Sequence, residues 1–160
     1  MKAEEFPALL QGMEIPGVTV GPVLNDQGEP AKPGSGLAHG FLVTAPSGAR
    51  IAWQVAVQID GLMEGDGPAA LFPEAVGLGD GQLVCADVEA CIGAWIGRSA
   101  AAPHVQKIVR YSNGDSHRAI RYGLRLDLYT GGRVFAQALW ILDPGEEPNR
   151  DNKYRMREAV

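Results

Sequence analysis

The chain has 160 residues, of which 46% are hydrophobic and 21% are charged, and its formal net charge is −5. This composition is typical of one globular domain and excludes an intrinsically disordered chain, which would lack the apolar residues that a core needs. The first residues do not form a basic segment followed by an apolar one, and no apolar run approaches the ~20 residues of a membrane span. We therefore expect a cytoplasmic protein with no membrane contact.

The charges are distributed unevenly along the chain. Residues 1–103 contain 4 basic and 12 acidic side chains, a balance of −8, whereas residues 104–160 contain 10 basic and 7 acidic side chains, a balance of +3. An acidic protein is a poor general binder of nucleic acid, but a local basic face can still hold another anion. These balances favour an anionic partner or a small molecule over nucleic acid.

The first half of the chain predicts one short helix and three strands. Apolar residues at helical spacing predict a helix at 3–13, and a strand at 18–24 is interrupted by glycine and proline, which is typical of a sheet edge. Strands at 39–45 and 50–60 flank a Pro-Ser-Gly turn and predict a β-hairpin. A long acidic loop follows at 61–82, in which residues 69–76 are expected to form one or two helical turns.

The second half repeats this order. A short strand at 83–86 leads into the best amphipathic helix of the chain, at 87–98, with Asp87 as its expected N-cap. The remaining strands are expected at 104–111, 120–129 and 133–142. Together the elements predict a single α+β domain at 1–144, with a mainly antiparallel sheet of about six strands and two principal helices on one face. Residues 145–160 lack apolar periodicity, which predicts a flexible charged tail.

The two hairpins indicate a duplicated helix–strand–hairpin unit. An offset of 83 positions aligns Gly40 with Gly123, Gly48 with Gly131 and Gln54 with Gln137, without a gap. The turns and the side-chain alternation coincide at the same offset. We therefore treat residues 1–60 and 83–143 as candidate repeats linked by the acidic loop, although any two hairpins of similar length look alike.

This order resembles the vicinal-oxygen-chelate fold, in which two βαβββ modules surround a cupped sheet. The resemblance implies a small-molecule-binding protein or an enzyme, with Gln54 and Gln137 at matching central positions of the cup. Metal-dependent members of that family use His and Glu on particular module strands. The strand at 83–86 has no His, and the strands at 50–60 and 133–143 have no Glu. Secretion-chaperone folds share the αβββα order as well.

No residues stand out as catalytic. Ser112, Asp115 and His117 are close in sequence, but a catalytic triad assembles through the fold, and this composition is what a hairpin turn requires. The two cysteines, Cys85 and Cys91, are too few for a disulfide scaffold and lack further zinc ligands. We expect reduced buried thiols, no metal site and no cofactor.

Two features are candidates for binding. The first is a cluster of four cations on neighbouring predicted strands, which could grip phosphate or carboxylate: Lys107, Arg110, Arg121 and Arg125. With Gln54 and Gln137 they make up the predicted ligand-binding set. A solvated sheet face, partly neutralised by Asp127, is the simpler interpretation of the four cations, and we prefer it.

The second feature is the last strand, which is apolar on both sides. Its alternation predicts that Val134, Ala136, Ala138, Trp140 and Leu142 face the helices. Phe135, Leu139 and Ile141 must then face the opposite side, where the tail, a long loop, a ligand or another subunit has to cover them; of these we favour a subunit interface.

Our leading hypothesis is therefore a non-catalytic binding protein, a homodimer that uses its exposed sheet face and engages an anionic partner. The alternatives are the cupped small-molecule binder or enzyme, and a structural subunit of a phage or secretion apparatus.

Overall fold

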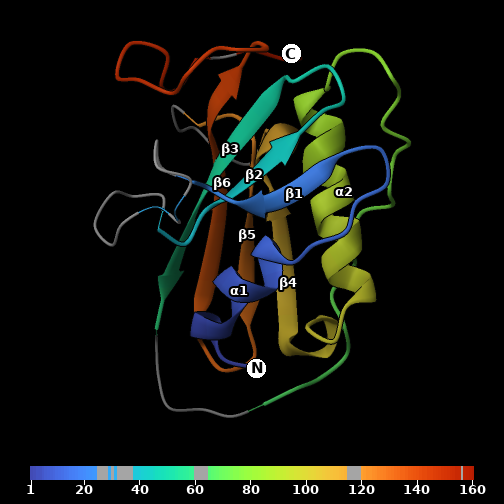
Figure 1. The fold of residues 1–160 in the computed structure, drawn as a ribbon. Helices are drawn as coiled ribbons and strands as arrows, with labels where there is room; N and C mark the ends of the chain where they lie inside the picture. Colours follow the sequence, from blue (N-terminus) through green and yellow to red (C-terminus); the bar gives the residue numbers. More distant parts are fainter. Residues whose placement is uncertain (25–28, 30, 32–37, 60–64, 115–119, 156) are drawn as a thin grey trace.

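The computed structural model describes residues 1–24, 29, 31, 38–59, 65–114, 120–155 and 157–160. In these residues one six-stranded antiparallel sheet has the order β1-β2-β3-β6-β5-β4 (Figure 1). The strands are β1 (Thr19–Pro22), β2 (Phe41–Thr44), β3 (Arg50–Gln58), β4 (Val105–Arg110), β5 (Gly123–Leu128) and β6 (Arg133–Leu142). The helices are η1 (Ala3–Glu5), α1 (Phe6–Gln11), α2 (Cys85–Arg98), η2 (Ala102–His104) and η3 (Tyr111–Asn113). The predicted α+β class is confirmed, and no described helix has the length and apolarity needed to cross a membrane.

Both α-helices lie on the same face of the sheet and enclose the main core (Figure 1). Phe6 of α1 and Ile92 of α2 are fully buried there, together with Trp53 of β3, whose ring stacks on Phe41 at a centroid distance of 5.6 Å. The predicted alternation of β3 is confirmed, because Ile51, Trp53 and Val55 all belong to this core.

An extended strap, residues 65–82, runs alongside α2 (Figure 1). A Cβ atom on Gly93 would lie 2.5 Å from Cγ of Pro73, and one on Gly97 would lie 2.7 Å from the Phe72 side chain, so α2 needs glycine at both positions. The predicted helical turns at 69–76 are wrong, because this segment is extended where its proline and phenylalanine pack on the glycine-lined side of the helix.

The entry to α2 also differs from the expectation. The helix begins at Cys85, so Asp87 lies in its first turn and is not the N-cap. In place of a strand at 83–86, Leu83 exchanges two backbone hydrogen bonds with Val160, at N···O distances of 2.6 and 2.9 Å. Residue 160 is buried in the main core, and the end of the chain is thereby attached to the start of α2.

A β-bulge in β6 changes which side chains face the helices. Ala52 pairs with Trp140 but Trp53 pairs with Ala138, so Leu139 is the extra residue. One extra residue reverses the two-residue period, and Ile141 therefore turns into the main core while Trp140 turns away from it. The predicted faces of Trp140, Ile141 and Leu142 are wrong for this reason, whereas Leu139 faces away from the helices as expected.

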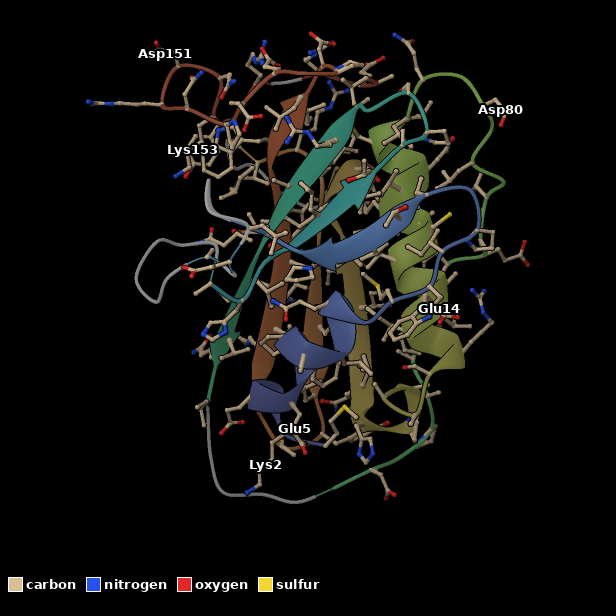
Figure 2. All side chains as sticks on the ribbon, viewed as in Figure 1. Lys2, Glu5, Glu14, Asp80, Asp151 and Lys153 are labelled. Atoms are coloured by element: carbon tan, nitrogen blue, oxygen red, sulfur yellow. The ribbon has the colours of Figure 1, made fainter. Side chains whose placement is uncertain are left out.

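The tail, residues 145–160, packs over the residues beyond this bulge. The Trp140 indole donates a hydrogen bond to the carbonyl of Asn149 at 2.9 Å, and the amide of Tyr154 donates to the carbonyl of Leu139 at 2.8 Å. The ammonium of Lys153 lies 5.1 Å from the centre of the Trp140 ring (Figure 2). Mobility of the tail stays a prediction, but its described residues are docked on the sheet.

The two halves of the sheet follow the same order, helix and then three strands. The pair Phe41–Trp53 of the first hairpin has its counterpart in Leu124–Ala136 of the second, shifted by the expected 83 positions. Gln54 and Gln137 pair with each other at the centre of the sheet. The outer strands do not keep the offset, because Thr44 pairs with Thr19 but Asp127 pairs with Lys107. A true duplication therefore stays a hypothesis.

Candidate functional site

The sheet face away from the helices has an uncovered part made of three cross-strand rows. Residues directly opposite one another on paired strands share a face, so the pairing register defines the rows. We call them together the open face: Lys107–Asp127–Arg133–Gln58, Val109–Arg125–Phe135–Ala56, and Gln137–Gln54 with Gly123 and Tyr111.

The first two rows carry a cationic cluster around one carboxylate. Asp127 Oδ1 lies 3.1 Å from Nε of Arg125 and 3.4 Å from Nε of Arg133. The Asp127 side chain is 22% exposed, and those of Arg125 and Arg133 are 33% and 48% exposed. Lys107, exposed, lies opposite Asp127 on the edge strand β4. Three cations and one anion give the open face a charge of +2 in a protein whose net charge is −5.

An apolar strip lies directly beside these charges. Phe135 and Val109 are partly buried and Ala56 is exposed, all in the row that contains Arg125. A row that joins a guanidinium to an aromatic ring and a methyl group can contact both an acidic group and an apolar group of one partner.

The third row is held by Tyr111 rather than by charge. A Cβ atom on Gly123 would lie 2.8 Å from the Tyr111 ring, so the ring takes the space of the missing side chain. The Tyr111 hydroxyl accepts a hydrogen bond from Nε2 of Gln137 at 3.2 Å. Gln137 in turn pairs with Gln54 across the centre of the sheet. This row is therefore the polar edge of the open face, on the side of the tail.

The structure separates the four predicted cations. Lys107 and Arg125 lie on the open face, whereas Arg110 lies on the helix side of the sheet. Its Nε donates to Glu89 of α2 at 2.9 Å. Arg121 pairs with Glu158 of the tail at 3.5 Å and lies outside the three rows.

Glu89, which holds Arg110, is a buried structural anchor. It is 0% exposed and accepts hydrogen bonds from the amide of Ser112 at 3.2 Å and from the amide of Gly123 at 2.9 Å. The Ser112 hydroxyl donates to the same carboxylate at 2.5 Å. Because its oxygens are fully engaged, this carboxylate joins α2 to β4 and β5 and has no free position for a substrate.

The three residues of the predicted partner interface also separate. Leu139 and Ile141 are each 3% exposed within the single chain, Leu139 in the smaller apolar cluster with Ala52, Trp140 and Leu142, and Ile141 in the main core. Neither is therefore available at the surface, because other parts of the same chain cover both side chains. Phe135 alone keeps part of its surface accessible, on the open face.

Neither cysteine is a candidate nucleophile. Both thiols are free and buried; burial raises the pKa of Cys85 to about 12 and also raises the pKa of Cys91. A protonated thiol is a poor nucleophile at neutral pH. His117 and Asp115 lie outside the described residues. Within the described ranges no group of three His, Cys, Asp or Glu side chains could hold a metal ion.

Arg133 and Tyr111 of the open face are functional candidates that the sequence pattern alone does not single out. Arg133 was placed only at the start of a strand, although it is in phase with Phe135 and Gln137 on the same side of β6. Tyr111 ends its strand at a 3-10 turn, and no local pattern relates it to Gly123, twelve residues later. Arg133 could have been found by alternation, whereas Tyr111 required the fold.

No protein-family model, curated protein or solved structure matches this chain.

Proposed function

We propose that this protein is a non-catalytic binding protein whose open face engages an acidic partner. The observation that carries the proposal is the +2 cluster of Lys107, Arg125, Arg133 and Asp127 on three neighbouring strands, beside the partly exposed Phe135. A positive patch on a negative protein orients an anionic partner and repels cationic surfaces, so it contributes selectivity as well as attraction.

The partner is expected to be an acidic protein segment rather than a small anion. The cations lie along a sheet face, and Asp127 occupies the centre of their cluster, so no single point is surrounded by donors alone. An extended chain can place carboxylates on both sides of Asp127 and an apolar side chain on Phe135. The neighbouring apolar strip gives such a segment a place to bury surface.

Self-association is a second candidate function, favoured by the charge distribution along the chain. Residues 1–103 have a balance of −8, so the first half of one copy could meet the open face of another. Such a head-to-tail contact would differ from the predicted contact through Leu139 and Ile141. Light scattering on size-separated protein at low and high salt distinguishes a monomer from this assembly.

The test is the binding of a fluorescently labelled oligoglutamate peptide, followed by anisotropy. We expect binding that weakens steeply between low and physiological salt, and that Lys107→Glu reduces at least about fivefold, an effect of roughly 1 kcal/mol. Arg150→Glu is the matched control: Arg150 is exposed, has no ion-pair partner among the described residues and changes the net charge equally. Equal losses for both variants would show that net charge, and not the open face, attracts the peptide.

A further inference from the structure

A cavity lies on the helix side of the molecule, between α2, the strap and the segment that precedes β1. It has a volume of about 310 Å³ and is lined mainly by apolar groups: Ile15, Pro16, Val76, Leu78 and Cys91, with Arg98 as the one charged lining residue in the described part of the chain. In Figure 2, Glu14 and Asp80 mark the two segments that flank α2 there.

The walls of this cavity are fixed to one another. The Cys91 thiol donates to the carbonyl of Val76 at 3.0 Å, which holds the strap to α2. Gly17 has φ of +91°, and a Cβ atom there would lie 2.9 Å from the carbonyl oxygen of Leu78. The segment before β1 can therefore approach the strap this closely only because residue 17 is a glycine. A cavity braced in this way is present before any ligand arrives, which lowers the cost of binding.

Two features of the lining lack a structural explanation. Val76 is 43% exposed although it lines an apolar cavity. Arg98 is exposed and has no ion-pair partner among the described residues. A cation in the last turn of α2 interacts favourably with the helix dipole, but this leaves its guanidinium donors free to bind an anion.

We propose that this cavity binds a small amphipathic carboxylate, with the carboxylate on Arg98 and the apolar part between Ile15, Leu78 and Val76. A guanidinium matches a carboxylate through two parallel hydrogen bonds. The volume accommodates about ten non-hydrogen atoms, at about 30 Å³ each, and lies at the lower end of the range for ligand sites. The site is separate from the open face and does not depend on the function proposed for it.

The experiment is an NMR titration of the full chain with octanoate, a monocarboxylate of this size. We expect a Kd of about 1 mM or below. The amide signals of Gly17 and Gly77 should shift, and those of Gly48 and Gly131, in the distant hairpin turns, should not. Octanol, which has the same chain without the charge, should bind more weakly.

Arg98→Gln should weaken octanoate binding about fivefold or more, Arg98→Lys should restore part of it, and Arg150→Gln should have no effect. The proposal is overturned if octanoate leaves the signals of Gly17 and Gly77 in place, or if it binds wild type and Arg98→Gln equally. The same spectra report whether each variant is folded, so a structural failure cannot be mistaken for a lost site.

Discussion

The sheet face away from the helices has two parts with opposite chemistry. Beyond the bulge at Leu139 it carries an apolar cluster that includes Ala52, Trp140 and Leu142, and the tail packs over this part. Before the bulge, the same face carries the cations and the polar row of the open face, and Ala56 and Lys107 remain exposed there. One strand, β6, contributes to both parts.

This difference shows that an apolar strand face need not indicate a second subunit. Apolar residues on both sides of β6 correctly predict that something covers them, and the chain supplies that cover itself. The accessible part of the face is recognised by its charged and mixed rows rather than by its hydrophobicity, since protein surfaces and transient interfaces are similarly apolar overall.

The largest expected effect comes from removing the cover. Deleting residues 148–160 should uncover Trp140 and remove Val160 from the main core, a loss on the order of 5 kcal/mol at ~1.5–3 kcal/mol for each large side chain. The thermal midpoint should fall by about 10–20 °C. Binding of a hydrophobic dye should increase in the folded fraction. A fall of only one or two degrees would show that the docked tail contributes little.

The same substitution on either side of the bulge should separate the two parts directly. Leu139→Glu places a carboxylate in the buried apolar cluster and should cost about 2–4 kcal/mol of unfolding free energy. Phe135→Glu places it on the open face, opposite Arg125, and should cost about 1 kcal/mol or less. Urea unfolding measures both. Equal costs would mean that the two parts are equally buried in solution.

The sequence pattern predicted the elements well because alternation and helical spacing are local properties. Strict alternation in β3 and the apolar spacing of α2 specify elements that the structure confirms within a few residues. The pattern failed at β6 because a bulge adds one residue without any local signal: Ala138 and Leu139 are both apolar, and the alternation reads equally well in either phase.

The candidate site could be predicted only in part, for a related reason. The cations Lys107 and Arg125 follow from alternation on neighbouring strands. Arg110 is one residue out of phase with Val109 and therefore faces Glu89, a partner that no strand pattern reveals. The docking of the tail depends on backbone carbonyls: that of Leu139 accepts from the amide of Tyr154, and that of Asn149 accepts from the Trp140 indole. Every residue has a backbone carbonyl, so no side-chain pattern in the sequence marks these contacts.

A smaller effect should follow from changing the charge at the centre of the open face. Asp127→Asn removes the anion between Arg125 and Arg133 and raises the charge of the face from +2 to +3. We expect tighter binding of oligoglutamate at low salt, by a few fold, with a stability loss below about 1 kcal/mol because all three side chains are partly exposed. Unchanged affinity would place the peptide elsewhere on the molecule.

The smallest effect concerns the ion pair that holds the end of the tail against the end of β6. Arg157 donates two hydrogen bonds to Asp143, at 2.8 and 3.0 Å, and they lower the pKa of the Asp143 carboxyl below its ordinary value. The unfolded chain therefore binds a proton at a higher pH than the folded chain does. The stabilisation is present above the ordinary pKa of aspartate and is lost as the pH falls through the lowered folded value.

Arg157→Gln should accordingly lower the thermal midpoint slightly at pH 7, and this difference from wild type should shrink as the pH falls below about 4. Arg150→Gln, in the same tail but without an ion-pair partner among the described residues, should match wild type at every pH. Since the pair is exposed, salt should reduce the difference as acid does. If the difference in thermal midpoint between wild type and Arg157→Gln stays constant with pH and salt, Arg157 holds the tail through packing of its side chain. The docking of the tail on the apolar part of the face would then not depend on charge at this end.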